Sequence, residues 1–373
     1  MSTAPQTITE PVTETPLAVL LRVAASTQVA WQGALTPRVF STLDEELTGL
    51  TAAAGIFDLG YKAYLQITGG DRLRWLNGMV TNAIQSLPEG HWNSSFLLNA
   101  QGRIQGDANV YRTPHTTTDT LILQTDRSQI ARLSAHLDHF IIMDDVELQP
   151  LDASQTTIGI AGPRTPGILS ALGLVLPEEG AFTSSNINGS VVTLVHAYSP
   201  IVPRFELWLP VAALASFWPA LESAGAVPSG VDALEALRIL EATPLYGIDI
   251  QERHLAQETG QMRMLNFNKG CYLGQEIVER IRSRATVHRT LRQFLVENAP
   301  AVLEPGQTIE LNAEGSERNP AGELTSLAHY ALPAFTGALA LGMIRTEAIE
   351  RKLPLTHSGG AVTVLDAPPP LNK

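Results

Sequence analysis

The chain has 373 residues, a length that predicts two or three domains. Hydrophobic residues make up 44% of it and charged residues 17%, which excludes a disordered or fibrous protein. With 25 basic and 37 acidic residues the net charge is −12, which argues against a protein that binds DNA along its phosphate backbone. The single cysteine excludes an intrachain disulfide and a metal site built from several cysteines.

The sequence predicts a protein of the cytoplasm without a membrane partner. No segment reaches the roughly 18–20 apolar residues that are needed to span a bilayer. The apolar stretch at 16–25 follows Glu10 and Glu14 rather than basic residues, which is not typical of a secretory signal. A lone free cysteine also fits a reducing compartment.

The first part of the chain predicts a tail, a strand and a helix. Residues 1–15 are rich in Thr, Pro and Glu, and we expect a mobile tail there. Segment 63–67 alternates like a half-buried strand. Asp71 then precedes a helix that carries Leu76 and Met79 at helical spacing.

A hairpin follows, with a turn at 99–102 and a return strand at 103–111. Alternate residues of that strand share one face, and on one of the two faces all five side chains have polar groups. This face could line a ligand cleft, or it could be a solvated face of the sheet. Its residues are Arg103, Gln105, Asp107, Asn109 and Tyr111.

The rest of the chain predicts a second αβ region and then a β domain. The strand at 157–161 runs through a Gly-Pro turn into a helix, but it lacks the glycine pattern and the lysine of phosphate-binding loops. A second helix is expected at 231–241. Short strands broken by Gly and Pro predict a small β-barrel over 289–373.

Cys271 lies in a glycine-flanked loop before a predicted helix. Ile277 and Ile281 are four residues apart, which predicts that the helix begins near Gly274. The helix N-terminus and the neighbouring Lys269 would stabilise an anion. One interpretation is therefore a reachable, partly ionised thiol, and the other is a small buried hydrophobic residue.

Positive charge is concentrated between positions 263 and 292, where seven of the 25 basic residues lie. This cluster suits an anionic small molecule, or a local contact with RNA or an acidic partner. It is equally consistent with a solvated basic face. The residues are Arg263, Lys269, Arg280, Arg282, Arg284, Arg289 and Arg292.

Segment 269–276, Lys-Gly-Cys-Tyr-x-Gly-Gln-Glu, resembles the signature of the YgfZ-type folate-binding proteins, a branch of the glycine-cleavage T-protein (aminomethyltransferase) superfamily. Segments 55–59 and 245–250 resemble further patterns of that superfamily. The resemblance implies an α+β fold in which three lobes form a ring around a central hole. Two αβ lobes, ferredoxin-like in part, would occupy 36–288, and the C-terminal β-barrel would occupy 289–373.

The resemblance also implies that the hole holds tetrahydrofolate, and that the protein helps to assemble or repair iron–sulfur proteins, including radical enzymes that modify tRNA. Cys271 and Lys269 would be the functional residues of the motif, and Cys271 could ligate a cluster transiently without a resident metal. The other motif residues are Gly270, Tyr272, Gly274, Gln275 and Glu276. The folate contacts would be Asp107, Asn109, Tyr246, Glu258, Arg280, Arg282 and Arg284, with Glu258 pairing with the donor edge of the pterin.

The sequence departs from the aminomethyltransferase pattern at three places, one of which is segment 238–244, where a common glycine is missing. Gly106-Asp107 stands where two adjacent aspartates are common, and 199–204 lacks the Tyr-Thr-Gly-Glu stretch. These departures favour the accessory role over transfer of a lipoyl-bound aminomethyl group. The alternative is a tetrahydrofolate-dependent one-carbon transferase in which Asp107 orients the folate. A folate-binding scaffold without thiol chemistry is a third interpretation.

Overall fold

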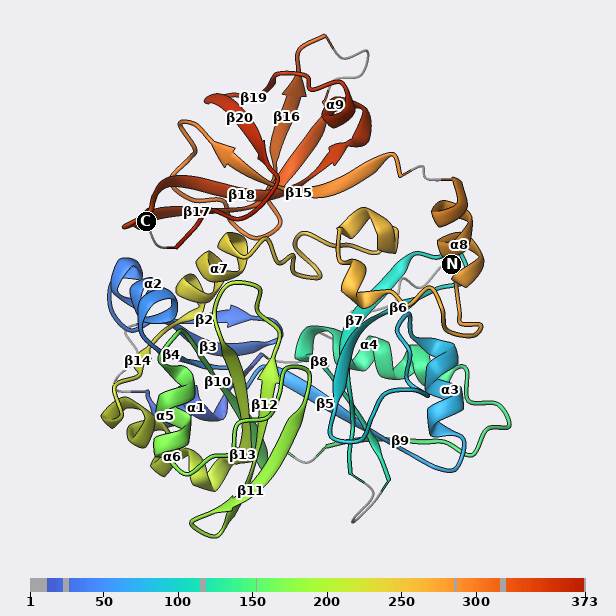
Figure 1. The fold of residues 1–373 in the computed structure, drawn as a ribbon, viewed down its shortest axis with the longest axis vertical. Helices are drawn as coiled ribbons and strands as arrows, with labels where there is room; N and C mark the ends of the chain where they lie inside the picture. The colour runs from blue at the N-terminus through green and yellow to red at the C-terminus, as the bar shows by residue number, and fades with distance from the viewer. Residues whose placement is uncertain are drawn as a thin grey trace, which may run out of the picture.

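A computed structural model of the protein shows two αβ lobes side by side beneath a β-barrel (Figure 1). The α+β fold with a C-terminal barrel that the sequence predicted is confirmed. Within the described part of the chain, no helix is both long and apolar enough to cross a membrane. The structure describes residues 12–22, 27–114, 119–151, 153–284, 287–315 and 320–371.

The first lobe is an antiparallel sheet of five strands in the order β6-β7-β8-β5-β9. Two helices, α3 (Arg72–Met79) and α4 (Arg127–Asp138), bury their apolar stripes with one face of this sheet. The other face carries the polar residues of β7, so the sheet separates a hydrophobic core from a polar surface. The strands are β5 (Lys62–Thr68), β6 (Trp92–Leu98), β7 (Ile104–Arg112), β8 (Leu121–Asp126) and β9 (Glu147–Pro150).

The second lobe is a sheet of six strands in the order β11-β12-β13-β10-β4-β14. Strand β4 (Gly55–Asp58) precedes the first lobe in the chain, yet it lies in this second sheet between β10 and β14. The first lobe is therefore inserted in the sequence between β4 and the remaining strands of the second lobe. The other strands are β10 (Gln155–Ala161), β11 (Phe182–Ile187), β12 (Ser190–Ala197), β13 (Arg204–Pro210) and β14 (Val227–Pro228). The helices on this lobe are α2 (Leu43–Ala52), α5 (Thr165–Ala171) and α6 (Val211–Ser223).

A small sheet, β1-β3-β2, holds the N-terminal part of the described chain. Strand β1 (Thr13–Glu14) pairs in parallel with β3 (Ala34–Val39), β2 (Thr27–Trp31) pairs with β3, and α1 (Pro16–Leu20) follows β1. Thr15 is fully buried, and its hydroxyl donates to the Asp58 carboxylate. The predicted mobile tail over 1–15 is therefore wrong for residues 13–15, and residues 1–11 lie outside the described residues.

The C-terminal lobe is a closed barrel, β15-β18-β17-β16-β19-β20, with a core of its own. It contacts the rest of the molecule through α7 (Val231–Leu240), whose end accepts hydrogen bonds from barrel side chains. The Tyr330 hydroxyl donates to the Ala236 carbonyl at 2.7 Å. The elements of the barrel lobe are β15 (Arg289–Val296), β16 (Ile309–Ala313), β17 (Gly322–Leu332), β18 (Phe335–Arg345), α9 (Thr346–Glu350), β19 (Leu355–His357) and β20 (Gly360–Leu365).

Candidate functional site

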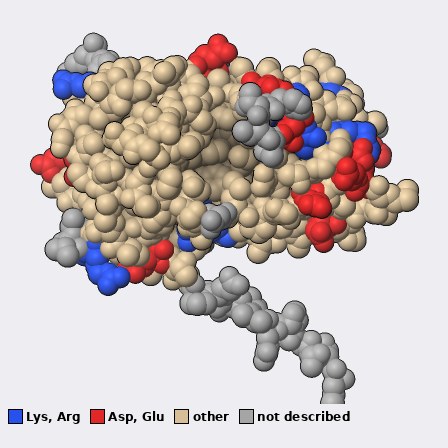
Figure 2. Space-filling view, turned by 90° about the horizontal axis from the view of Figure 1, so that it is seen from below, with Lys and Arg blue, Asp and Glu red and all other residues tan. Residues whose placement is uncertain are grey.

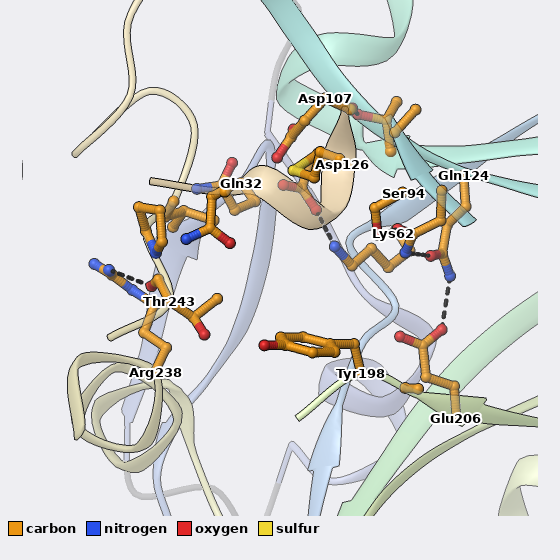
Figure 3. A pocket seen from close by; sticks show the side chains of 18 of the residues that line it. Gln32, Lys62, Ser94, Asp107, Gln124, Asp126, Tyr198, Glu206, Arg238 and Thr243 are labelled. Carbon is orange, nitrogen blue, oxygen red and sulfur yellow. Dashed lines mark hydrogen bonds and ion pairs between the residues drawn. The ribbon is translucent and has the colours of Figure 1, made fainter. Parts of the chain in front are cut away.

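A central cavity of about 200 Å³ lies between the two αβ lobes. Its walls come from β5, β7, β8 and β13, from α7, and from the segments near residues 244 and 263 (Figure 3). Seen from below, the surface is hollowed near the middle, and most charged side chains lie towards the two ends (Figure 2). The cavity is thus the place where segments far apart in sequence bring polar groups together.

Asp107 reaches this cavity from β7, together with Asn109 but without Arg103, Gln105 or Tyr111 of the same strand face. Its Oδ1 accepts a hydrogen bond from Gln129 Nε2 at 2.9 Å. Burial and the nearby Asp126 carboxylate raise the pKa of Asp107 above its usual value. The carboxylate therefore faces the cavity in an environment that disfavours its charge.

Gln124 on β8 connects the polar groups of the cavity wall. Its Oε1 accepts from Asn109 Nδ2 at 2.9 Å and from the Tyr111 hydroxyl at 3.1 Å. Its Nε2 donates to Glu206 at 2.7 Å and to the Tyr64 hydroxyl at 3.2 Å. Because every polar atom of this amide is used, the network fixes the orientation of Asn109 and Glu206.

Glu206 is a buried carboxylate that the sequence analysis did not single out. Only 5% of it is exposed, and its Oε2 accepts from Gln124 and from Trp208 Nε1. Figure 3 shows its other oxygen directed towards the side of the cavity where Tyr198 lies. The signal that could have found it is the period of two in β13, which places Arg204, Glu206 and Trp208 on one face.

Cations and aromatic rings complete the cavity wall. The Arg263 guanidinium lies 3.9 Å from the centre of the Tyr198 ring and donates to Ser94 Oγ at 2.9 Å. Lys62 forms an ion pair with Asp126 at 2.7 Å. Within the described residues, neither Asp107 nor Glu206 has an ion-pair partner. The carboxylates of Asp107 and Glu206 can accept hydrogen bonds from the N–H groups of a ligand. The neighbouring aromatic ring and cations suit a ligand that is planar and carries an anionic end.

Tyr246 and Glu258, which the sequence analysis assigned to folate, do not line the cavity. The Tyr246 hydroxyl donates to the Gln105 carbonyl at 3.0 Å and accepts from Arg132 Nη2 at 2.9 Å. Glu258 is buried in the short 3₁₀ helix η1 (Ala256–Thr259), and its Oε2 accepts from the Leu255 N–H at 2.8 Å. Both polar groups thus have protein partners away from the cavity, Tyr246 with distant segments and Glu258 within its own turn.

The three arginines expected at the folate tail lie on α8 (Gln275–Arg284), at the outer edge of the first lobe in Figure 1. Arg280 is exposed. Arg282 lies over the Phe267 ring and 3.7 Å from the Glu279 carboxylate. Arg284 ends the helix, and its side chain lies outside what the structure describes. Neither Arg280 nor Arg282 lines the cavity, because the helix that carries them packs beyond its wall.

Lys269 has a structural partner set that its sequence context did not reveal. Its Nζ donates to the carbonyl oxygens of Asn77 and Val80 at 2.6 Å and of Asn82 at 2.7 Å. Burial lowers the pKa of Lys269 to about 7, whereas the three carbonyls act in the opposite direction by stabilising the ammonium. The ammonium therefore ties the motif loop to the end of α3 and the residues that follow it, and the expected role of Lys269 as a cation serving Cys271 stays a prediction.

The Cys271 thiol is exposed, four positions before the first residue of α8. Gly274 has φ +81°, and a Cβ there would lie 2.6 Å from the Asn99 carbonyl oxygen, so this turn requires glycine. Exposure favours the reachable thiol over the buried hydrophobic residue. Among the other motif residues, Gly270 and Glu276 are exposed, Gln275 is half-buried and Tyr272 is buried.

Comparisons with known proteins agree with this architecture. The profile of the GCVT N-terminal domain matches residues 18–269. An aminomethyltransferase of Exiguobacterium sibiricum is 25% identical over 308 residues, which cover 80% of this chain and 84% of the relative. An aminomethyltransferase of Thermus thermophilus is 26% identical over 355 residues, covering 94% and 96%.

A solved structure shows the same fold. The glycine cleavage system aminomethyltransferase T from Bartonella henselae superposes with a TM-score of 0.83 at 18% identity, covering 96% of this chain and 98% of that one. The aminomethyltransferase-like arrangement that the sequence resemblance implied is therefore confirmed. Because the domain match extends over more than half of its length, the chain belongs to the family of the GCVT N-terminal domain.

Proposed function

We propose that this protein binds tetrahydrofolate in the central cavity. The observation that carries the proposal is the pair of carboxylates, Asp107 and Glu206, that face the cavity without an ion-pair partner among the described residues. A reduced pterin presents an edge of N–H donors, and a buried carboxylate is a strong acceptor for such an edge. Glu206 takes the role that the family resemblance had implied for Glu258.

The other wall residues match the remainder of such a ligand. Tyr198 and Trp92 offer aromatic surface to a flat ring system. Arg204 and Arg263 have no carboxylate partner among the described residues, and they supply positive charge for the carboxylates of a glutamate tail. Asp107 lies beside them, and it would orient the reduced ring.

Titration calorimetry with tetrahydrofolate tests this assignment. Glu206→Gln should weaken binding by about 1–3 kcal/mol, because a neutral amide cannot accept two charge-assisted hydrogen bonds. Glu258→Gln is the matched control, since it retains an acceptor for the Leu255 N–H and lies outside the cavity. Unchanged affinity in Glu206→Gln, or weakening only in Glu258→Gln, would move the pterin edge away from Glu206.

We further propose that the protein helps to assemble or repair iron–sulfur proteins, with Cys271 as the functional thiol. This part of the proposal is supported by the exposure of the thiol and by the resemblance of segment 269–276 to the YgfZ-type signature. A single cysteine cannot hold a cluster alone, so a client protein or another thiol would supply the remaining ligands. Iron–sulfur proteins of the cytoplasm, among them radical enzymes that modify tRNA, are the proposed clients.

A deletion strain complemented with variants tests this role. Cys271→Ser should bind tetrahydrofolate normally and fail to restore the activities of iron–sulfur enzymes and thiolated tRNA bases. Full restoration by Cys271→Ser at normal protein levels would end the proposed role of the thiol.

One observation favours the alternative function, a tetrahydrofolate-dependent one-carbon transferase. Asp107 faces the cavity with a raised pKa, as expected of a group that handles a proton during transfer. Tetrahydrofolate supplies ring nitrogens that accept a one-carbon unit. Robust methylene-tetrahydrofolate formation from an aminomethyl-lipoyl carrier, lost in Asp107→Asn, would establish this alternative and displace the accessory role.

A further inference from the structure

A second cavity of about 190 Å³ lies at the seam between the barrel and the segment that precedes η1. Arg253 enters it from that segment, whereas Arg289 and Arg345 enter from strands β15 and β18. Met343 lies buried beneath them. No residue of this arginine cavity lines the central cavity, so the two sites are distinct.

The register of the barrel places two of these cations side by side. Arg289 and Arg345 are direct partners in the antiparallel ladder of β15 and β18. Like charges directly opposite each other destabilise a sheet, so this pair costs the barrel stability. An anion between the two guanidiniums would reverse the sign of that contribution.

The charges in the arginine cavity do not balance. Arg253 forms an ion pair with Glu323, which neutralises one cation. Arg345 Nε donates to the Pro320 carbonyl at 3.2 Å, a contact that leaves its charge uncompensated. Within the described ranges, neither Arg289 nor Arg345 has a carboxylate partner. Among the described residues that line the cavity, three guanidiniums and one carboxylate leave a net charge of +2, in a protein whose total is −12.

A buried histidine lies beside the cavity, next to the Arg253 guanidinium. His254 is 3% exposed, and burial together with the charges of Arg253, Arg289 and Arg103 lowers its pKa to about 4. His254 is therefore neutral at physiological pH, and the arginines alone provide the charge.

The backbone shapes the wall of this cavity. A Cβ at Gly322 would lie 2.2 Å from the Met343 carbonyl oxygen, so β17 and β18 approach each other closely there and leave that wall without a side chain. Guanidinium groups present fixed forks of N–H donors that match tetrahedral oxyanions in a bidentate manner. A dianion matches the net charge of +2, whereas a single carboxylate would leave one cation unpaired.

We propose that Arg253, Arg289 and Arg345 form a binding site for a phosphate dianion, either free phosphate or the terminal phosphate of a small phosphomonoester. The site does not depend on folate binding in the central cavity.

Thermal unfolding of the full chain at pH 8 and constant ionic strength tests the site, with inorganic phosphate replacing chloride. Phosphate should raise the unfolding temperature of the wild type in a saturable manner. Arg289→Gln and Arg345→Gln should each weaken this effect by about tenfold or more, because each removes charge-assisted hydrogen bonds. Arg351→Gln is the matched control, since Arg351 pairs with Glu347 outside the arginine cavity.

The chemical source of the phosphate is read from two further probes. Glycerol 3-phosphate should bind if the terminal phosphate of a phosphomonoester is the ligand, and tighter binding than that of inorganic phosphate would identify this source. Dimethyl phosphate, a monoanion, should not bind measurably. Equal stabilisation by dimethyl phosphate and phosphate, or an equal phosphate effect in wild type and Arg289→Gln, would overturn the proposal.

The same variants separate binding from a merely structural role. Without phosphate, Arg289→Gln should be as stable as the wild type or more stable, because it relieves the repulsion across β15 and β18. If both Arg289→Gln and Arg345→Gln lowered the stability and phosphate did not protect the wild type, the arginines would be structural and the proposal would be wrong.

Discussion

The central cavity and the Cys271 loop are built in opposite ways. The cavity draws its polar groups from strands of both αβ lobes and holds them in a buried network around Gln124. The loop comes from one short segment, which Gly274 and Lys269 hold against the first lobe with the thiol exposed. A conspicuous sequence motif therefore marks a surface element, whereas the buried polar site has no contiguous motif at all.

This difference indicates how the two regions should respond to substitution. Buried, interconnected groups are costly to remove one at a time, because each leaves a partner unsatisfied. Exposed groups can change with little effect on folding. Substitutions in the buried network should therefore lower the free energy of unfolding, whereas substitutions of exposed groups should leave it nearly unchanged.

The largest effect on the free energy of unfolding is expected where Asp249 and α7 contact the barrel. Asp249 is fully buried; it accepts from Arg238 at 2.6 Å and from the hydroxyls of Thr325 and Ser326 in the barrel. Asp249→Ala should lower the free energy of unfolding by about 3–5 kcal/mol, because it leaves Arg238 buried with one carboxylate fewer. Chemical denaturation measures this, and Asp232→Ala, which removes an exposed ion pair, should cost less than about 1 kcal/mol.

Lys269→Ala should have the next largest effect, and it tests whether the motif lysine serves the fold or the thiol. Loss of three hydrogen bonds from a half-buried ammonium should lower the free energy of unfolding by roughly 2–4 kcal/mol. Unfolding in urea checks the stability, and the alkylation rate of Cys271 checks the thiol. Unchanged stability with slower alkylation would return the lysine to the role of a cation that serves the thiol.

Asp107→Asn should raise the stability of the protein at neutral pH, in contrast to Asp249→Ala and Lys269→Ala. A carboxyl whose pKa is raised in the folded state binds more protons there than in the unfolded chain. Stability therefore falls as the pH rises from the usual carboxyl range through the raised pKa, and the cost persists at neutral pH. Removing the charge should raise stability at pH 7 by about 1 kcal/mol. A pH series of thermal unfolding should show a flatter acidic limb for Asp107→Asn, and a loss of stability at pH 7 would contradict this account of the site.

Cys271→Ser should have the smallest effect on folding. The side chain is exposed, so the free energy of unfolding should change by no more than about 0.5 kcal/mol. In the wild type, alkylation should go to completion under native conditions. If the thiol reacted only after denaturation, the loop would bury it, and the Cys271 loop would not be the exposed element that distinguishes it from the buried cavity.

Local elements could be predicted well from the sequence, because their signals lie within a few residues. The helix that carries Leu76 and Met79, the helix after Gly274 and the barrel strands follow from spacing, glycine positions and turns. The polar face of β7 indicated Asp107 and Asn109, since alternation along one strand is a local property. The same rule applied to β13 would have indicated Glu206.

Partners from distant segments could not be predicted in this way. Alternation places Glu206 on one face of β13, but only the packing of β13 against β8 decides that this face meets the cavity. Glu258 instead accepts from the Leu255 N–H, just before its own 3₁₀ helix. Likewise Lys269 stands beside Cys271 in the sequence, yet its ammonium binds carbonyls almost two hundred positions earlier in the chain.

The sequence by itself thus determined the family resemblance, the αβ-to-barrel order, the turn at Gly274 and the polar strand of Asp107, all of which depend on neighbours in the chain. The tertiary structure decided that β4 joins the second lobe, that Gln124 links Asn109 to Glu206, and that Arg289 faces Arg345. The physical reason is range: periodicity and turn chemistry act over a few residues, whereas burial and charge pairing depend on which segments the folded core brings into contact.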